Sequence, residues 1–267
     1  MNLSRFSLEG KVALVTGGSR GIGRATALGF AEAGADVVVA SRKLPDLEKV
    51  ADEIRGVGRK ALPVEAHAGR MDDIGRLVET VVAEFGKIDI LVNNAGTNPA
   101  MATVLEADER LWDSIMNLNL KGVYFLSQAV ARVMKEHGGG KIINVASMDG
   151  YKPELDVGIY SISKAAVLMV TKSMALELAQ HNIRVNAIAP GAVSTRILDS
   201  HWFHLPEEEA KKQKAELGKM APLQRVGEPD EMVGAMVYLA SDASSFMTGE
   251  TLLVDGGMLL GSAPWVQ

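Results

Sequence analysis

The sequence has no cysteine among its 267 residues. This absence excludes disulfide bonds, catalysis by a thiolate and zinc sites built on cysteine, and we expect no metal site of another kind. It is compatible with a reducing compartment, and we expect the protein to be cytoplasmic.

Basic residues are also in short supply, with 28 Lys and Arg against 33 Asp and Glu and a net charge of −5. A nucleic-acid partner is therefore not expected, because nucleic-acid binding relies on a basic surface. The N-terminus lacks the charged and apolar pattern of a signal peptide, and a membrane span is not expected because no run of eighteen apolar residues occurs. With 47% hydrophobic residues, the composition predicts a soluble globular protein with a sizeable core.

Short apolar segments rich in valine and isoleucine alternate with helical patterns along the chain. Strands apolar on both faces, each followed by a helix, are what a parallel sheet covered on both sides requires. No linker or change in composition divides the pattern, so we expect one α/β domain over residues 1–267. The expected strands are residues 11–18, 36–42, 60–68, 87–96, 140–147, 183–191 and 249–257, and the expected helices include 21–35, 44–58, 71–85, 111–133 and 160–180.

The alternation lapses between residues 194 and 227, where two helix-like pieces occur without a strand. An insert after a late strand of a parallel sheet lies at the carboxyl edge, where ligands bind in such folds. We interpret this segment as a small helical lid over the substrate. The alternative is a surface elaboration that only packs.

A glycine-rich turn, TGGSRGIG at residues 16–23, follows the first expected strand. Gly17, Gly21 and Gly23 permit a tight turn and let phosphates approach backbone N–H groups at a helix N-terminus. The spacing is not G-x-G-x-x-G, because the third place falls on Thr26, and it is not a P-loop. Its position after a buried strand favours a dinucleotide site over a simple connector.

The end of the second expected strand indicates which dinucleotide is bound. A carboxylate there would bind the 2′-hydroxyl of NAD, whereas an arginine suits the 2′-phosphate of NADP. The strand ends in Ser41, Arg42 and Lys43 without an acid, and Arg20 adds a guanidinium from the glycine turn. Because guanidinium groups bind phosphate bidentately, we predict NADP(H), with NAD less favoured. The alternative is that Arg42 and Lys43 are ordinary solvated charges.

Taken in order, TGGSRGIG, NNAG at residues 93–96 and YSISK at 160–164 resemble the motifs of the short-chain dehydrogenase/reductase (SDR) family. The resemblance extends over nearly the whole chain, through NLKG at 119–122, INVAS ending at Ser147, APG at 189–191 and TGETLLVDGG near the C-terminus. It implies a Rossmann-like, doubly wound parallel sheet of about seven strands with helices on both faces.

The resemblance also implies a catalytic tetrad of Asn119, Ser147, Tyr160 and Lys164. Because residues four apart share one face of a helix, the Lys164 ammonium is expected to lower the pKa of Tyr160 from its usual value of about 10. Tyr160 would then be the general acid or base, and Ser147 would hydrogen-bond the substrate oxygen. Asn119 is expected, by resemblance, to hold a water that links Lys164 to solvent.

The same matching implies cofactor contacts along the carboxyl edge of the sheet. The NNAG segment is expected beside the adenosine ribose, with Asn93 partly structural, and APGAVST around the nicotinamide. His67 stands where many relatives have an adenine-binding aspartate, and is as readily a plain surface residue. The expected cofactor contacts are Gly17, Ser19, Arg20, Gly21, Ile22, Gly23, Ser41, Arg42, Lys43, His67, Ala68, Asn93, Ala95, Gly96, Tyr160, Lys164, Pro190, Gly191, Val193 and Thr195.

Apolar and aromatic side chains near the tetrad are candidates for the substrate pocket. With Ser147, we expect Met148 and Tyr151 from the serine loop, and Trp202 and Phe203 from the lid, to contact the substrate. Such walls favour a fairly hydrophobic ketone or alcohol, although the same side chains would also serve to pack the lid. Further candidate walls are Asn98, Leu155 and His204.

These observations predict an NADP(H)-dependent oxidoreductase that transfers hydride between nicotinamide and a carbonyl or secondary alcohol, that is, a carbonyl reductase or alcohol dehydrogenase. The alternatives are a 3-oxoacyl-[acyl-carrier-protein] reductase and a non-catalytic NADP-binding regulator, which the complete tetrad disfavours. The helix over 160–180 is apolar around most of its circumference and is therefore expected to be buried. Relatives commonly form tetramers through this helix and the one at 111–133, so we expect a homotetramer.

Overall fold

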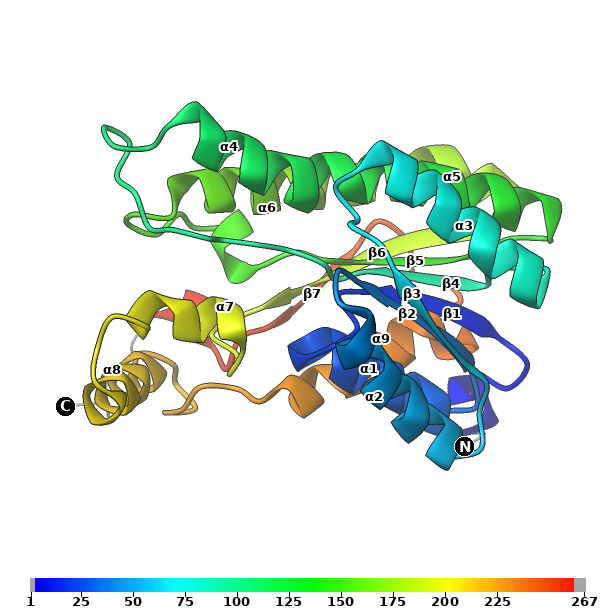
Figure 1. Cartoon of the computed structure of the whole chain (residues 1–267), viewed down its shortest axis with the longest axis horizontal. Helices are drawn as coiled ribbons and strands as arrows, with labels where there is room; N and C mark the ends of the chain where they lie inside the picture. The colour runs from blue at the N-terminus through cyan, green and yellow to red at the C-terminus, as the bar shows by residue number, and fades with distance from the viewer. Residues whose placement is uncertain (1–2, 262–267) are drawn as a thin grey trace.

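The computed structural model describes residues 3–261 and contains a seven-stranded sheet in the order β3-β2-β1-β4-β5-β6-β7 (Figure 1). Every pair of neighbouring strands is parallel. The strand order reverses between β1 and β4, which is where doubly wound sheets bind ligands. The predicted fold class is confirmed. The strands are β1 (Val12–Thr16), β2 (Asp36–Ser41), β3 (Ala61–Glu65), β4 (Ile90–Asn93), β5 (Gly140–Val145), β6 (Ile183–Pro190) and β7 (Thr251–Val254).

Helices cover both faces of this sheet (Figure 1). One layer holds α1 (Gly21–Glu32), α2 (Leu44–Gly56) and α9 (Val233–Ala240), and the other holds α3 (Met71–Phe85), α4 (Glu109–Met116), α5 (Val123–Glu136) and α6 (Gly158–Leu178). Alternate strand residues enter opposite cores: Val15 and Val39 pack with the first layer, and Leu14 and Val38 with the second. Because both faces are buried, the strands are continuously apolar, and this made them predictable.

The helix expected over residues 111–133 is interrupted. A π-helical stretch, Asn117–Gly122, lies between α4 and α5. Such stretches are often found at functional sites, and this one carries Asn119, which is fully buried.

The expected insert between residues 194 and 227 is present. It contains α7 (Arg196–Asp199), a 3-10 turn (Ser200–Trp202) and α8 (Glu207–Lys219), without a strand in this fully described segment. A parallel bridge between Val193 and Gly227 closes its base. Lys214 joins its two helices, since its Nζ donates to Ser194 Oγ at 2.7 Å and to Asp199 Oδ1 at 2.9 Å. The insert lies beside the end of β7 at the carboxyl edge of the sheet (Figure 1).

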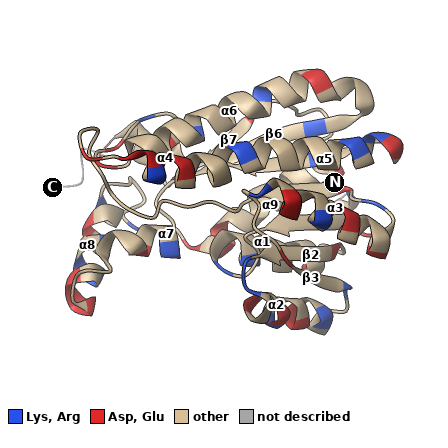
Figure 2. Cartoon of the chain, turned by 45° about the horizontal axis from the view of Figure 1, so that its top comes forward, with Lys and Arg blue, Asp and Glu red and all other residues tan. Residues whose placement is uncertain are grey.

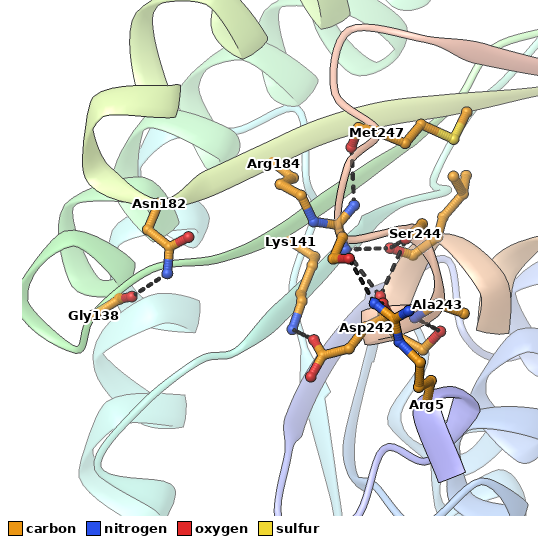
Figure 3. A network of polar contacts seen from close by, with 12 residues as sticks. Arg5, Gly138, Lys141, Asn182, Arg184, Asp242, Ala243, Ser244 and Met247 are labelled. Atoms are coloured by element: carbon orange, nitrogen blue, oxygen red, sulfur yellow. Dashed lines mark hydrogen bonds and ion pairs between the residues drawn. The ribbon is translucent and has the colours of Figure 1, made fainter. Parts of the chain in front are cut away.

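At the opposite edge of the sheet, Arg184 of β6 anchors the chain between α9 and β7 (Figure 3). Its guanidinium donates to the carbonyl oxygens of Met247 at 3.0 Å, Ser241 at 3.0 Å and Leu239 at 3.2 Å. An ion pair of 3.1 Å between Lys141 and Asp242 lies next to it. These contacts hold the last strand in register with β6, far from the carboxyl edge.

The helix α6, together with the turn after it, is apolar on more than its sheet-facing side. By length and composition alone, Gly158–His181 is long and apolar enough to cross a membrane, but the core helix of a soluble protein passes the same test. Its inner face packs Val167 against the sheet, while Met169 and Leu176 are 64% and 84% exposed. The outer face is therefore available for contact with another chain.

Candidate active site

A cleft of about 360 Å³ lies along the carboxyl edge of the sheet. Its walls are the glycine turn, the segments that follow the central strands, the start of α6 and the insert. It brings together most of the predicted site residues: Gly17, Ser19, Arg20, Gly21, Ile22, Ser41, Arg42, Lys43, His67, Ala68, Ala95, Gly96, Asn98, Ser147, Met148, Tyr160, Lys164, Pro190, Gly191, Val193, Thr195 and Trp202.

Other predicted residues lie outside the cleft lining. Asn93 is buried in the core, where its Nδ2 donates to Ser127 Oγ at 2.8 Å and to Asn144 Oδ1 at 2.9 Å, so its role in this structure is structural. Tyr151 and Phe203 are 52% and 64% exposed. The remaining residues outside the lining are Gly23, Asn119, Leu155 and His204. Residues 3–261 contain no cluster of His, Asp and Glu able to hold a metal ion.

The glycine turn forms one wall of the cleft. Gly17 has φ +65°, and a Cβ on it would lie 2.7 Å from Asn94 Nδ2, which itself donates to the Thr16 carbonyl oxygen at 2.8 Å. A side chain at position 17 would therefore displace the contact between β1 and the loop after β4. The helix α1 then starts at Gly21, and the N-cap residue Arg20 makes no side-chain capping bond. Uncapped first-turn N–H groups form an anion-binding site.

Cations gather at this end of the cleft. Burial lowers the pKa of Arg20, the nearby charges of Arg196 and Arg42 lower it further, and Asp46, which also lines the cleft, has a smaller opposite effect. Lys43 also lines the cleft, and β2 ends in Ser41 rather than an acid. Such a group of cations fits a phosphate better than a ribose hydroxyl. Arg196 was not identified from the sequence, because only the folded insert brings it near the glycine turn.

His67 lies on the same side of the cleft, at the end of β3. Its Nδ1 accepts a hydrogen bond from the Gly69 N–H at 3.1 Å. Burial lowers its pKa, and the charges of Arg42 and Arg70 add to this effect. The imidazole is therefore neutral at pH 7 and can face a neutral base without adding charge.

The opposite end of the cleft holds Ser147, Tyr160 and Lys164. Ser147 follows β5, and Tyr160 and Lys164 lie one turn apart near the start of α6. The Lys164 Nζ lies 5.5 Å from the centroid of the Tyr160 ring and donates to the Val145 carbonyl oxygen at 2.8 Å. The end of β5 and the start of α6 thus place Ser147, Tyr160 and Lys164 together at this end of the cleft.

The pKa of Tyr160 shifts in the opposite direction to the lowering that its spacing from Lys164 led us to expect. Burial raises the pKa of Tyr160, the Asp149 carboxylate raises it further, and hydrogen bonding by Ser147 lowers it. Burial also lowers the pKa of Lys164 to about 8. The expectation that Lys164 depresses the Tyr160 pKa is therefore wrong for the folded chain, because desolvation of the phenolate prevails. Tyr160 holds its proton at neutral pH and is suited to donating it.

Asn119 lies behind these residues in the π-helical stretch. Its Oδ1 accepts from the Thr97 N–H at 2.8 Å, and its Nδ2 donates to Thr97 O at 3.0 Å and Ser163 Oγ at 3.1 Å. A Cβ on Gly96 would lie 3.5 Å from Asn119 Oδ1 and 3.6 Å from Lys164 Nζ. The missing side chain at Gly96 thus leaves space between the Asn119 amide and the Lys164 ammonium.

Asp149, Glu154 and His201 also line the cleft, although they belong to none of the sequence motifs. Asp149 Oδ2 accepts from Ser147 Oγ at 3.1 Å. Burial and the neighbouring Glu154 raise the Asp149 pKa to about 6. The only sequence signal for Asp149 was its place two residues after Ser147, and no spacing rule pointed to Glu154 or His201.

The raised Asp149 pKa predicts a gain in stability on neutralisation. Its carboxyl binds a proton more tightly in the folded chain than in the unfolded one, so its contribution to the free energy of unfolding falls as pH rises from about 4 to 7. Asp149→Asn should therefore be more stable than wild type by about 2 to 3 kcal/mol at pH 7 and by less at pH 5. Denaturant unfolding at both pH values measures the gain. An equal gain at both would contradict the assignment of this titration to Asp149.

The doubly wound sheet, the glycine turn and the Ser-Tyr-Lys arrangement together define a dinucleotide-dependent oxidoreductase of the Rossmann class. Comparison with known families supports a narrower statement. A family model described as "Enoyl-(Acyl carrier protein) reductase" matches residues 17–259. The chain belongs to the short-chain dehydrogenase/reductase family, as its motifs predicted.

Individual relatives match along nearly the whole chain. The 2-dehydro-3-deoxy-D-gluconate 5-dehydrogenase of Escherichia coli K12 is 44% identical over 97% of this chain and 99% of its own length. Human dehydrogenase/reductase SDR family member 4 is 38% identical over 95% of this chain and 89% of its own. The structure of a gluconate 5-dehydrogenase from Burkholderia cenocepacia, in complex with NADP and tartrate, has a TM-score of 0.89 and 37% identity, covering 97% of this chain and 98% of that one.

Proposed function

We propose that this chain is an NADP(H)-dependent carbonyl reductase that also oxidises the corresponding secondary alcohol. The observation that carries the proposal is the layout of the cleft: Ser147, Tyr160 and Lys164 meet at one end, and cations gather at the other. NADPH, when bound, supplies the hydride, and the protein supplies orientation and the proton.

Each residue at the catalytic end has a role that its surroundings support. Tyr160, kept in its phenol form by burial, donates a proton to the carbonyl oxygen during reduction. The Ser147 hydroxyl, whose hydrogen bond goes to Asp149 Oδ2 in the free chain, would donate instead to the same oxygen and stabilise the charge that develops on it. Lys164, whose pKa is lowered to about 8, returns a proton to Tyr160 after turnover. Asn119 is a positioning residue: we expect it to hold a water that links Lys164 with solvent.

The cofactor part of the proposal is supported by residues at the other end of the cleft and by the NADP in the Burkholderia structure. The glycine turn would hold the pyrophosphate on the N-terminus of α1. Arg20, Arg42 and Lys43 would bind the 2′-phosphate. Ala95 and Gly96 would lie beside the ribose and His67 and Ala68 beside the adenine, with the nicotinamide bounded by Pro190, Gly191, Val193 and Thr195.

The alternative of a 3-oxoacyl-[acyl-carrier-protein] reductase is not favoured. The first turn of α8, in the insert beside the cleft, carries the exposed acids Glu207, Glu208 and Glu209 (Figure 2). Lys211 pairs with Glu207 and Glu208, and α8 carries four lysines against four glutamates. This side of the cleft therefore offers no basic surface to attract an acidic carrier protein, and a small free substrate does not need one.

We also propose that residues 1–267 form one domain, with the insert as its lid, and that the protein is a cytoplasmic homotetramer. The tetramer is supported by apolar side chains exposed on α5 and α6, namely Tyr124, Phe125, Met169 and Leu176, which an interface would bury. Light scattering should give four times the chain mass of 28.5 kDa, and a monomeric mass would contradict it. Cell fractionation tests the location.

The decisive experiment follows the absorbance of NADPH with a broad panel of ketones and aldehydes. Carbonyl-dependent loss of absorbance is expected with NADPH and to a much smaller extent with NADH. No consumption of either nucleotide with any carbonyl, by protein that binds NADPH, would contradict the proposed reductase and favour a binding protein.

A further inference from the structure

Four cations at the end of the cleft formed by the glycine turn have no partner in the described chain. Arg20, Arg42, Lys43 and Arg196 line the cleft and are exposed. None of them takes part in an ion pair or donates a side-chain hydrogen bond within residues 3–261. Of the three acids in the cleft lining, Asp46 is the one whose charge acts on Arg20. An anionic ligand would relieve this excess of like charge.

Arg196 differs from the other three cations because it belongs to the insert. Lys214 holds the two helices of the insert together through Ser194 and Asp199. Arg196 makes no contact of that kind in the described chain, and the start of α7 at this residue has no side-chain capping bond. Its guanidinium is therefore not needed to hold the insert together and is free to bind a ligand.

Two observations place Arg196 near the N-terminus of α1. The residue before it, Thr195, lies against the glycine turn: a Cβ on Gly21, the first residue of α1, would lie 3.4 Å from Thr195 Cγ2. Burial has the largest effect on the pKa of Arg20, the N-cap residue of α1, and the Arg196 charge lowers it further, more than the charge of Arg42 does. Arg196 thus lies near the first-turn N–H groups, whereas Arg42 follows β2.

The pyrophosphate is the part of the cofactor that has no cation in the proposed layout. Arg20, Arg42 and Lys43 are assigned to the 2′-phosphate. The pyrophosphate is charged on both phosphates, yet it would meet only the neutral N–H groups of the glycine turn and α1. A guanidinium binds phosphate oxygens through two parallel N–H groups and adds a full charge to the contact. A cation near the N-terminus of α1 would therefore complete this site.

We propose that Arg196 binds the pyrophosphate of the cofactor and so completes the dinucleotide site from the insert. The inference rests on the dinucleotide site of the proposed function. It gives the insert a second role beside that of a substrate lid, because Arg196 begins the short helical run that ends at Trp202, a residue of the cleft lining. One continuous segment would thus carry a cofactor contact and an expected substrate wall.

The test measures the Kd of NADPH and the Kd of NADH by fluorescence titration of the whole chain. Arg196→Met removes the guanidinium and keeps an unbranched side chain. Because both nucleotides contain the pyrophosphate, both Kd values should rise by about 10-fold or more, as expected for the loss of a hydrogen bond between charged groups. Arg196→Lys keeps the charge without the planar fork, so its Kd values should lie between those of wild type and Arg196→Met.

Two further variants serve as controls. Arg42→Met removes a cation assigned to the 2′-phosphate, so it should weaken NADPH binding and leave NADH binding nearly unchanged. Lys212→Met removes an exposed cation of α8 that lies outside the cleft lining, and it should change neither Kd. Salt should raise the Kd of wild type more steeply than that of Arg196→Met, because the variant lacks one charged contact.

The outcomes separate this inference from the proposed function. Unchanged Kd values in an Arg196→Met variant that melts cooperatively would overturn the inference and make Arg196 a solvated charge. A loss confined to NADPH would also overturn it, since Arg196 would then bind the 2′-phosphate, and so would an equal loss in Lys212→Met, which would reflect surface charge in general. Wild-type protein that bound neither nucleotide would overturn the inference and the proposed function together, whereas binding without turnover of any carbonyl would overturn only the reductase.

Discussion

Tyr160→Phe should lower kcat for ketone reduction by a factor of about 100 to 10,000, the usual contribution of a general acid. Burial raises the pKa of the Tyr160 phenol, so it keeps its proton throughout the neutral range and can donate it to the carbonyl oxygen. The substitution removes one oxygen and preserves the ring against which Lys164 lies. NADPH affinity, measured by fluorescence titration, should therefore change little.

Tyr151→Phe provides the matched control for this experiment. Tyr151 also follows Ser147, but it is 52% exposed and lies outside the cleft lining, so the same loss of a phenol should leave kcat unchanged. Residual activity of Tyr160→Phe within a few-fold of wild type would show that the proton comes from another group. Asp149, whose pKa is raised to about 6, would then be the next candidate.

Arg42→Asp should lower the ratio of kcat/KM with NADPH to that with NADH by a factor of about 100 or more. Removing a charge-assisted bond to the 2′-phosphate costs about 1.5 to 3 kcal/mol, and the new carboxylate adds repulsion of the phosphate. A carboxylate at the end of the second strand is also placed to accept the ribose hydroxyl of NADH. The ratio should therefore fall for two reasons: kcat/KM with NADPH decreases, and kcat/KM with NADH increases.

Lys49→Asp makes the same change of charge on the exposed surface of α2, outside the cleft lining. It should leave the cofactor ratio close to that of wild type. If Arg42→Asp left the ratio unchanged as well, Arg42 would be a solvated charge, and Arg20 with Arg196 would have to account for any preference for NADPH.

The fold was largely predictable because its signals are local in sequence. A strand buried on both faces must be apolar throughout, as Val37–Val39 are, and a chain that turns into a helix over a phosphate site needs glycine at Gly17 and Gly21. The ordered motifs then identified the family. The bounds of the long helix near Asn119 were less predictable, because six residues with i→i+5 hydrogen bonds are too few to leave a distinct pattern in the sequence.

Properties of the site that depend on environment were not predictable in the same way. Spacing placed Lys164 beside Tyr160, but the direction of the Tyr160 pKa shift depends on desolvation, which only the packed cleft sets. Asn93 belongs to a motif expected near the ribose, yet its Nδ2 donates both of its hydrogen bonds within the core. Tyr151 and Phe203 have the composition of pocket walls but lie outside the lining, exposed to solvent.

The sequence alone determined the strand pattern, the family and the residues available for catalysis, because periodicity, turn chemistry and ordered motifs are properties of neighbouring residues. The tertiary structure alone decided which charges meet. It brought Arg196 from the insert to the glycine turn, and it brought Asp149 close to Glu154. Electrostatic energies depend on distance and burial, and neither quantity is encoded in the spacing of residues along a chain.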